Sequence, residues 1–129
     1  MKKLSALFIA FLFLAVSSCS TINQNTGNDL NWEGIYTGTL PGANSDIYTE
    51  ITLNKDATYK VTHQYVDKSA EVFTYTGIFK WKNNNTIDLN QDGMPSYYIV
   101  GKNSLTHLDK DGQKITGRFA DMYVLKKKQ

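Results

Sequence analysis

The chain has 129 residues, with 14 lysines and arginines against 12 aspartates and glutamates. This length suits one small domain with its own core. The near balance of charge excludes the positive field that nucleic-acid binding requires, so we expect no nucleic-acid partner. The one run of like charge, residues 126–128, is expected to be a solvated tail.

The chain begins with an export signal. Lys2 and Lys3 precede an apolar run over residues 4–16, which is too short to cross about 30 Å of hydrocarbon as a helix. Small residues then lead directly to Cys19, the one cysteine of the chain, which therefore has no disulfide partner. The pattern predicts a lipoprotein signal peptide over residues 1–18, and lipidation of Cys19 after cleavage.

Residues 19–31 are predicted to form a lipidated, flexible tether. They are rich in Ser, Thr, Asn, Gln and Gly, and such a segment spans about 20 Å on average. No acidic residue occurs between Cys19 and Asp29, so the usual inner-membrane retention signal is missing. We therefore expect a lipid anchor in the outer membrane, at its periplasmic face.

From residue 32 onward, apolar and polar residues alternate with a period of two between clusters of Gly, Asn and Asp. Long strands are expected over residues 32–40, 47–53, 59–65 and 73–81, with turns at 54–57 and 83–85. Shorter strands are expected at 86–89, 97–100, 105–108, 114–118 and 123–126. The fold class is therefore all-β.

About eight short antiparallel strands in a meander, with glycines at inward positions, favour a small barrel; a two-sheet sandwich is the alternative. The interior of such a barrel is either filled by side chains or just wide enough for one small ligand. The inward aromatic residues favour a filled interior, with a ligand-lined cavity as the alternative reading.

An ordered set of landmarks then resembles a known family. These landmarks are Trp32-x-Gly34-x-Tyr36-x-Gly38-x-Leu40-Pro41, Tyr59, Phe79-x-Trp81, Ser104-Leu105, Leu108-Asp109-x-Asp111-Gly112, Ile115-Thr116-Gly117 and Tyr123-Val124-Leu125-Lys126. The chain resembles the N-terminal domain of the NlpE family, outer-membrane lipoproteins associated with copper resistance and with signalling of envelope and surface-contact stress. The resemblance implies an NlpE-like, lipocalin-like β-barrel domain over residues 32–127.

The sequence departs from that family at one motif. Many members carry a Cys-x-x-Cys pair just after the Leu-Pro, and the corresponding positions here are Gly42 and Ser45. Without thiolates, neither a cuprous site nor a local disulfide can form there. Larger members also carry a second, C-terminal barrel with its own cysteines, whereas this sequence stops at Gln129. We therefore expect no redox sensing and no tight cuprous site.

Residues 88–93 match the start of a calcium loop. Position eight is Pro95, position twelve is Ile99 instead of the bidentate Glu that the motif needs, and strands rather than helices flank the segment. A polar hairpin loop is the better interpretation, and residues 109–112 read as a hairpin turn.

His63 and His107 are the two histidines, and neither has a ligand or a carboxylate at a suitable spacing. His63 is expected in the core or at the barrel mouth, hydrogen-bonded to a tyrosine or to backbone. Met94 and Met122 are expected to pack or to be exposed rather than to bind copper. The sequence therefore predicts no catalytic residue, no metal site, no cofactor and no enzyme.

Three functions follow as hypotheses. The first is a non-enzymatic lipoprotein of the NlpE type, acting in envelope homeostasis or stress signalling through an envelope protein partner. The second is a lipocalin-like carrier of a small apolar ligand, which requires a cavity of about 300 Å³ or more, open at one end. The third is an inhibitor of an envelope hydrolase, which would present the loop over residues 41–46.

Overall fold

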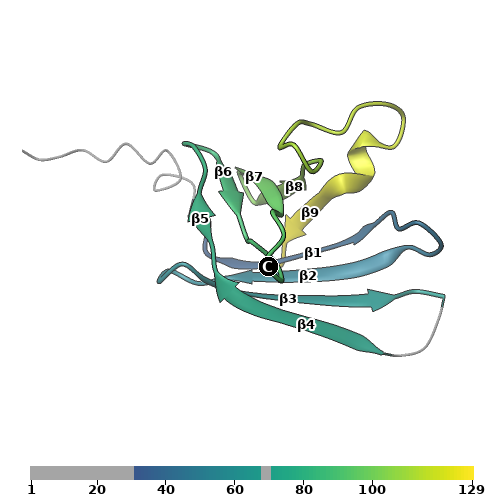
Figure 1. Ribbon diagram of the computed structural model, residues 1–129, viewed down its shortest axis with the longest axis horizontal. Helices are drawn as coiled ribbons and strands as arrows, with labels where there is room; N and C mark the ends of the chain where they lie inside the picture. Colours follow the sequence, from purple (N-terminus) through teal and green to yellow (C-terminus); the bar gives the residue numbers. More distant parts are fainter. Residues whose placement is uncertain (1–30, 68–70) are drawn as a thin grey trace, which may run out of the picture.

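The computed structural model describes residues 31–67 and 71–129, which form an antiparallel sheet (Figure 1). Its nine strands are β1 (Gly34–Leu40), β2 (Ile47–Leu53), β3 (Thr58–Tyr65), β4 (Val72–Ile78), β5 (Lys80–Trp81), β6 (Thr86–Asp88), β7 (Tyr97–Gly101), β8 (Ser104–His107) and β9 (Val124–Lys127). A short 3-10 helix, η2 (Ala120–Tyr123), precedes β9. Within the described residues, no helix is long and apolar enough to cross a membrane.

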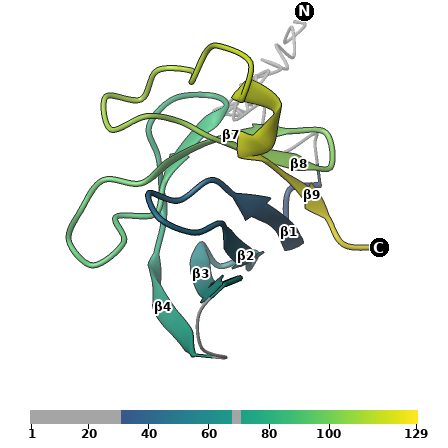
Figure 2. The ribbon, with the colours of Figure 1, turned by 90° about the vertical axis from the view of Figure 1, so that its right-hand side faces the viewer.

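The strands form a meander that closes on itself between β1 and β9. Their order in the sheet is β4-β3-β2-β1-β9-β8-β7-β6-β5, so β4 and β5 are the two ends of the sheet and follow each other in sequence. In the view of Figure 2, strands β1 to β4 form one wall of the barrel and strands β7 to β9 form the other. The result is a nearly closed barrel, which confirms the predicted fold class.

Two predicted strands differ from the structure. The strand expected at 73–81 is divided at Phe79, whose side chain is buried and whose backbone N–H donates to the carbonyl of Ala57 at 2.9 Å. The strand expected at 114–118 is absent: Lys114 makes an isolated bridge to Leu108, and the chain then turns at Gly117. Gly117 has a φ of 104°, a conformation that favours glycine and ends extended pairing.

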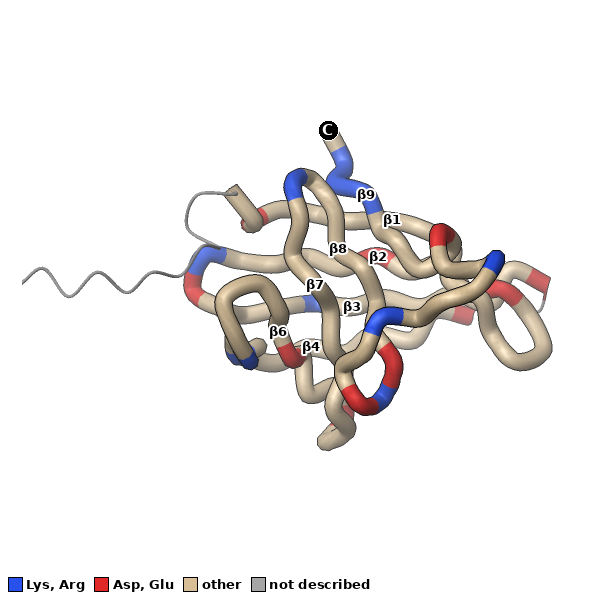
Figure 3. The backbone as a smooth tube through the Cα atoms, turned by 90° about the horizontal axis from the view of Figure 1, so that it is seen from above, with Lys and Arg blue, Asp and Glu red and all other residues tan. Residues whose placement is uncertain are grey.

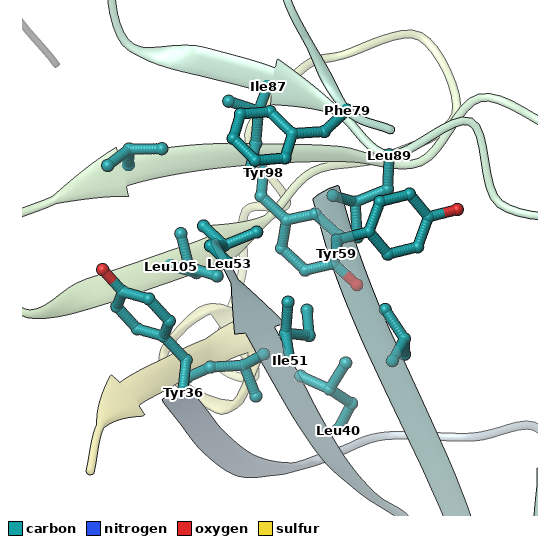
Figure 4. Close-up of a cluster of buried hydrophobic side chains, with 13 residues drawn as sticks. Tyr36, Leu40, Ile51, Leu53, Tyr59, Phe79, Ile87, Leu89, Tyr98 and Leu105 are labelled. Carbon is teal, nitrogen blue, oxygen red and sulfur yellow. The ribbon is translucent and has the colours of Figure 1, made fainter. Parts of the chain in front are cut away.

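The alternating pattern places one face of each long strand inside the barrel. Tyr36 on β1 pairs with Ile51 on β2, and Ile51 pairs with Val61 on β3; all three are fully buried. Their side chains converge with those of the opposite wall in one core (Figure 4). The core members are Tyr36, Leu40, Ile51, Leu53, Tyr59, Val61, Phe79, Ile87, Leu89, Tyr98, Val100, Leu105 and Leu125.

One end of the barrel is plugged by aromatic rings. Trp32 meets Phe79 edge to face, with ring centroids 5.4 Å apart, and meets Trp81 at 6.0 Å. The Tyr36 hydroxyl donates to the Trp32 carbonyl at 2.6 Å, which ties the start of β1 to the core. Strand β1 therefore begins at the filled end of the barrel and runs toward the other end.

Lysines and arginines alternate with acidic residues around the described surface, and most of them lie in turns and at strand ends (Figure 3). The basic residues near the C-terminus form the one visible run of a single sign. This mixed distribution agrees with the balanced charge of the sequence.

Candidate ligand pocket

The barrel end opposite the aromatic plug holds a pocket of about 410 Å³. It is formed where β1, β3 and β8 end and where β2 and β7 begin, together with the loop between β6 and β7. The apolar and aromatic part of its wall consists of Leu40, Pro41, Ile47, Tyr75, Met94, Pro95, Tyr98 and Tyr123. The polar part consists of Thr49, His63, Gln91, Asp92, Ser96 and His107.

His63 is held in a chain of hydrogen bonds. The Thr49 hydroxyl donates to the carbonyl of Ile47 at 3.3 Å and therefore accepts from Nδ1–H of His63 at 3.0 Å. The amide NH₂ of Gln91 donates to Nε2 of His63 at 3.2 Å. This arrangement assigns the neutral imidazole with its proton on Nδ1.

Burial lowers the pKa of His63. The imidazole is therefore neutral at pH 7. Its ring also meets Tyr75 edge to face, with centroids 5.9 Å apart. The predicted position of His63 at the barrel mouth is confirmed, but its hydrogen-bond partners are Thr49 and Gln91 rather than a tyrosine or the backbone.

His107 lies in the same pocket between two tyrosines. Its ring centroid is 4.9 Å from that of Tyr98 and 6.2 Å from that of Tyr123, and the Tyr123 ring is stacked on it. Its Nδ1 is buried and has no hydrogen-bond partner among the residues that the structure describes. Burial, and to a smaller extent the charge of His63, lower the pKa of His107. Sequence reasoning did not place His107 in a pocket with His63. The signal was nevertheless present, because His107 lies two residues after Leu105, on the same face of the strand, and the structure buries Leu105.

The loop over residues 88–93 is organised by its own carboxylate. Oδ1 of Asp88 accepts from the backbone N–H of Asn90 at 2.8 Å and of Ser96 at 2.9 Å. This confirms a polar loop between two strands and leaves Asp88 committed to the backbone. Among the described residues, no group of three or more His, Cys, Asp or Glu side chains could hold a metal ion.

The loop over residues 41–46, which stands where many family members have the Cys-x-x-Cys motif, is held by hydrogen bonds and close contacts. Ser45 is 7% exposed; its hydroxyl donates to the Asp46 carbonyl at 3.2 Å and accepts from the N–H of Asp67 at 3.3 Å. A Cβ on Gly42 would overlap the carbonyl oxygen of Ser45 and lie 3.1 Å from Cγ1 of Ile47. A cysteine pair at positions 42 and 45 therefore does not fit this backbone.

The other candidate residues are dispersed or lie outside the described chain. Met94 is 69% exposed at the pocket rim, and Met122 is 40% exposed in η2. Cys19, the signal peptide over residues 1–18 and nearly all of the tether over residues 19–31 lie outside the described residues. Lipidation of Cys19 therefore stays a prediction.

The fold and its pocket define a class of protein: small meander barrels that are filled at one end and open at the other. Residues 36–118 match the NlpE N-terminal domain, so the chain belongs to the NlpE family. This confirms the family indicated by the sequence landmarks. No match emerged among curated proteins.

Two of the solved structures that resemble this one show the extent of the likeness. A putative lipoprotein from Shewanella oneidensis is 38% identical, with a TM-score of 0.72 over 82% of this chain and 94% of that chain. The Cpx pathway activator NlpE from Escherichia coli is 27% identical, with a TM-score of 0.56 over 67% of this chain and 47% of that chain. The likeness therefore spans about half of the Escherichia coli protein.

Proposed function

We propose that this protein is a non-enzymatic outer-membrane lipoprotein of the NlpE type, which acts in envelope homeostasis or stress signalling through a protein partner. Membership of the NlpE family carries the proposal. The similar Escherichia coli structure is that of a Cpx pathway activator, which supports a signalling role and the need for a downstream partner. The predicted export signal directly before Cys19 supports an envelope location.

Replacement of the anchoring cysteine tests this proposal. The variant Cys19→Ser should lose palmitate labelling and move from the outer-membrane fraction to the soluble periplasm, since multiple acyl chains make the anchorage durable. In a diderm host with an envelope-stress reporter, raised levels of the lipidated protein should change reporter output. An unchanged reporter together with correct anchoring would contradict the signalling role, and labelled Cys19→Ser would contradict the anchor.

A second candidate function, transport or sequestration of a small apolar molecule, is favoured by the pocket. At about 410 Å³ and open at one barrel end, the pocket meets the size that the carrier hypothesis requires. The rest of the barrel interior is filled by its core and, at the other end, by the aromatic plug, so a ligand inside the barrel would occupy this end. Extraction of the native lipoprotein followed by mass spectrometry of bound small molecules tests this candidate.

A further inference from the structure

The pocket wall carries a negative charge and no positive side chain among its described residues. Among the described residues that line it there is no lysine or arginine, and Asp92 supplies a carboxylate at the exposed rim. His63 and His107 add no positive charge at pH 7, because burial holds both in the neutral form. An anion that entered would lose its hydration without gaining a cationic partner, and such a transfer is unfavourable.

The rest of the wall suits flat apolar groups. Tyr75, Tyr98 and Tyr123 contribute aromatic rings from three different elements, and two of them already pack on the imidazole of His107. Rings of this kind prefer offset-stacked or edge-to-face contacts with another ring. Met94 at the rim adds a flexible, polarizable side chain that adapts to irregular ligands.

We propose that this pocket binds a small, uncharged, largely aromatic molecule and discriminates against an anion of the same shape. This inference rests on the carrier function proposed above and narrows its ligand class. The discrimination comes from the absence of any cationic side chain among the described lining residues, together with the carboxylate of Asp92.

Two fluorescent probes that differ by one sulfonate test the proposal. The mature chain with Cys19→Ser, purified without detergent, is titrated with uncharged N-phenylnaphthylamine and with anilinonaphthalene sulfonate. Saturable one-to-one binding of the uncharged probe is expected. The sulfonated probe should bind on the order of tenfold more weakly or worse, because its charge is buried without a partner.

Matched charge variants locate the effect. Met94→Lys places a cation at the pocket rim and should raise the affinity for the sulfonated probe relative to that for the uncharged probe, because the loss of the Met94 contact affects both probes alike. Ile78→Lys makes the same kind of change at a residue of similar exposure, 66% against 69%, at the end of β4 near the aromatic plug, and should alter neither affinity. Phe73→Ser removes an exposed ring that lines a separate hollow of about 380 Å³ beside Ser45 and Tyr65, and not this pocket, so it should also leave binding intact.

Equal affinity of the unmodified pocket for both probes would overturn the charge discrimination while leaving the carrier function standing. Absence of saturable binding by either probe would overturn the binding site itself. Loss of binding in Phe73→Ser would place the probe in the hollow beside Ser45 and Tyr65 rather than in this pocket, and would also overturn the proposal. None of these outcomes bears on lipid anchoring, so failure of this inference is distinguishable from failure of the lipoprotein function.

Discussion

His63 on β3 and His107 on β8 line the same pocket, although β2, β1 and β9 separate their strands in the sheet. Curvature of the sheet brings them together across the barrel interior, and the charge of His63 contributes to the lowered pKa of His107. A hydrogen-bonded imidazole and one whose Nδ1 has no described hydrogen-bond partner therefore share a partly enclosed space. Protonation of either one disfavours protonation of the other.

Stability should therefore fall in mild acid. Both histidines have a pKa below the unfolded value of about 6.5, so below that pH the unfolded chain binds more protons than the folded chain. The groups that face them are Thr49, Gln91 and Tyr75 for His63, and Tyr98 and Tyr123 for His107; Asp92 lies on the same pocket wall.

Urea unfolding at a series of pH values checks this expectation. The free energy of unfolding should be fully retained above about pH 6.5 and should decrease as the pH is lowered toward about 5. In His107→Phe the decrease should be smaller, because one titrating group and its unpartnered Nδ1 are gone. A decrease of the same size in that variant would show that other groups cause the acid sensitivity.

The aromatic plug should contribute measurably to stability. Trp32→Ala removes a half-buried ring that contacts both Phe79 and Trp81, and should lower the free energy of unfolding by about 2–4 kcal/mol. Trp32→Phe keeps part of the edge-to-face contact and should lose less. Chemical denaturation of the three proteins measures the difference, and equal stability of Trp32→Ala and the parent would contradict the plug.

Closure of the barrel depends on a glycine at the seam between β1 and β9. A Cβ on Gly38 would lie 2.7 Å from Cδ2 of Leu125 and 3.2 Å from the carbonyl oxygen of Val124. Gly38→Ala should therefore cost about 1–3 kcal/mol through overpacking. The neighbouring Thr39 is exposed, so Thr39→Ala should change stability by less than about 0.5 kcal/mol. Thermal unfolding of both variants decides whether the seam is this tight.

Copper should not bind tightly to the mature domain. Both ring nitrogens of His63 are engaged in hydrogen bonds, and positions 42 and 45 hold no thiol. Competition titration with a cuprous chelator should show no stoichiometric site of high affinity. Tight one-to-one binding would contradict this expectation and return copper handling to the list of functions.

The loop geometry makes a further prediction about Gly42→Cys combined with Ser45→Cys. Because a Cβ at position 42 overlaps the Ser45 carbonyl, the loop must move, and the free energy of unfolding without copper should fall by about 1–3 kcal/mol. Cuprous copper should then restore stability if the moved loop brings the thiolates together. Ser45→Cys alone provides the control for loss of the serine hydrogen bonds.

The sequence by itself determined the fold class, most strand positions and the family. Alternation with a period of two is a local property, and it placed Tyr36, Ile51 and Val61 on inner faces where the structure buries them completely. Turn residues at 54–57 and 83–85 likewise acted over short distances and ended strands where expected. The prediction of a strand at 114–118 was wrong, because the alternation of residue types did not reveal that the chain turns at Gly117.

Only the tertiary structure decided the pocket. Gln91 lies against His63, and His63 and His107 line one pocket. Both arrangements depend on how strongly the sheet curves. They also depend on which end of the barrel is filled by the rings of Trp32, Phe79 and Trp81. The same holds for position 42, which corresponds to a cysteine in many family members, whereas here the Ser45 carbonyl occupies the space that a Cβ would need. These are contacts between residues set by long-range pairing of strands, and no local pattern in a single sequence encodes their distances.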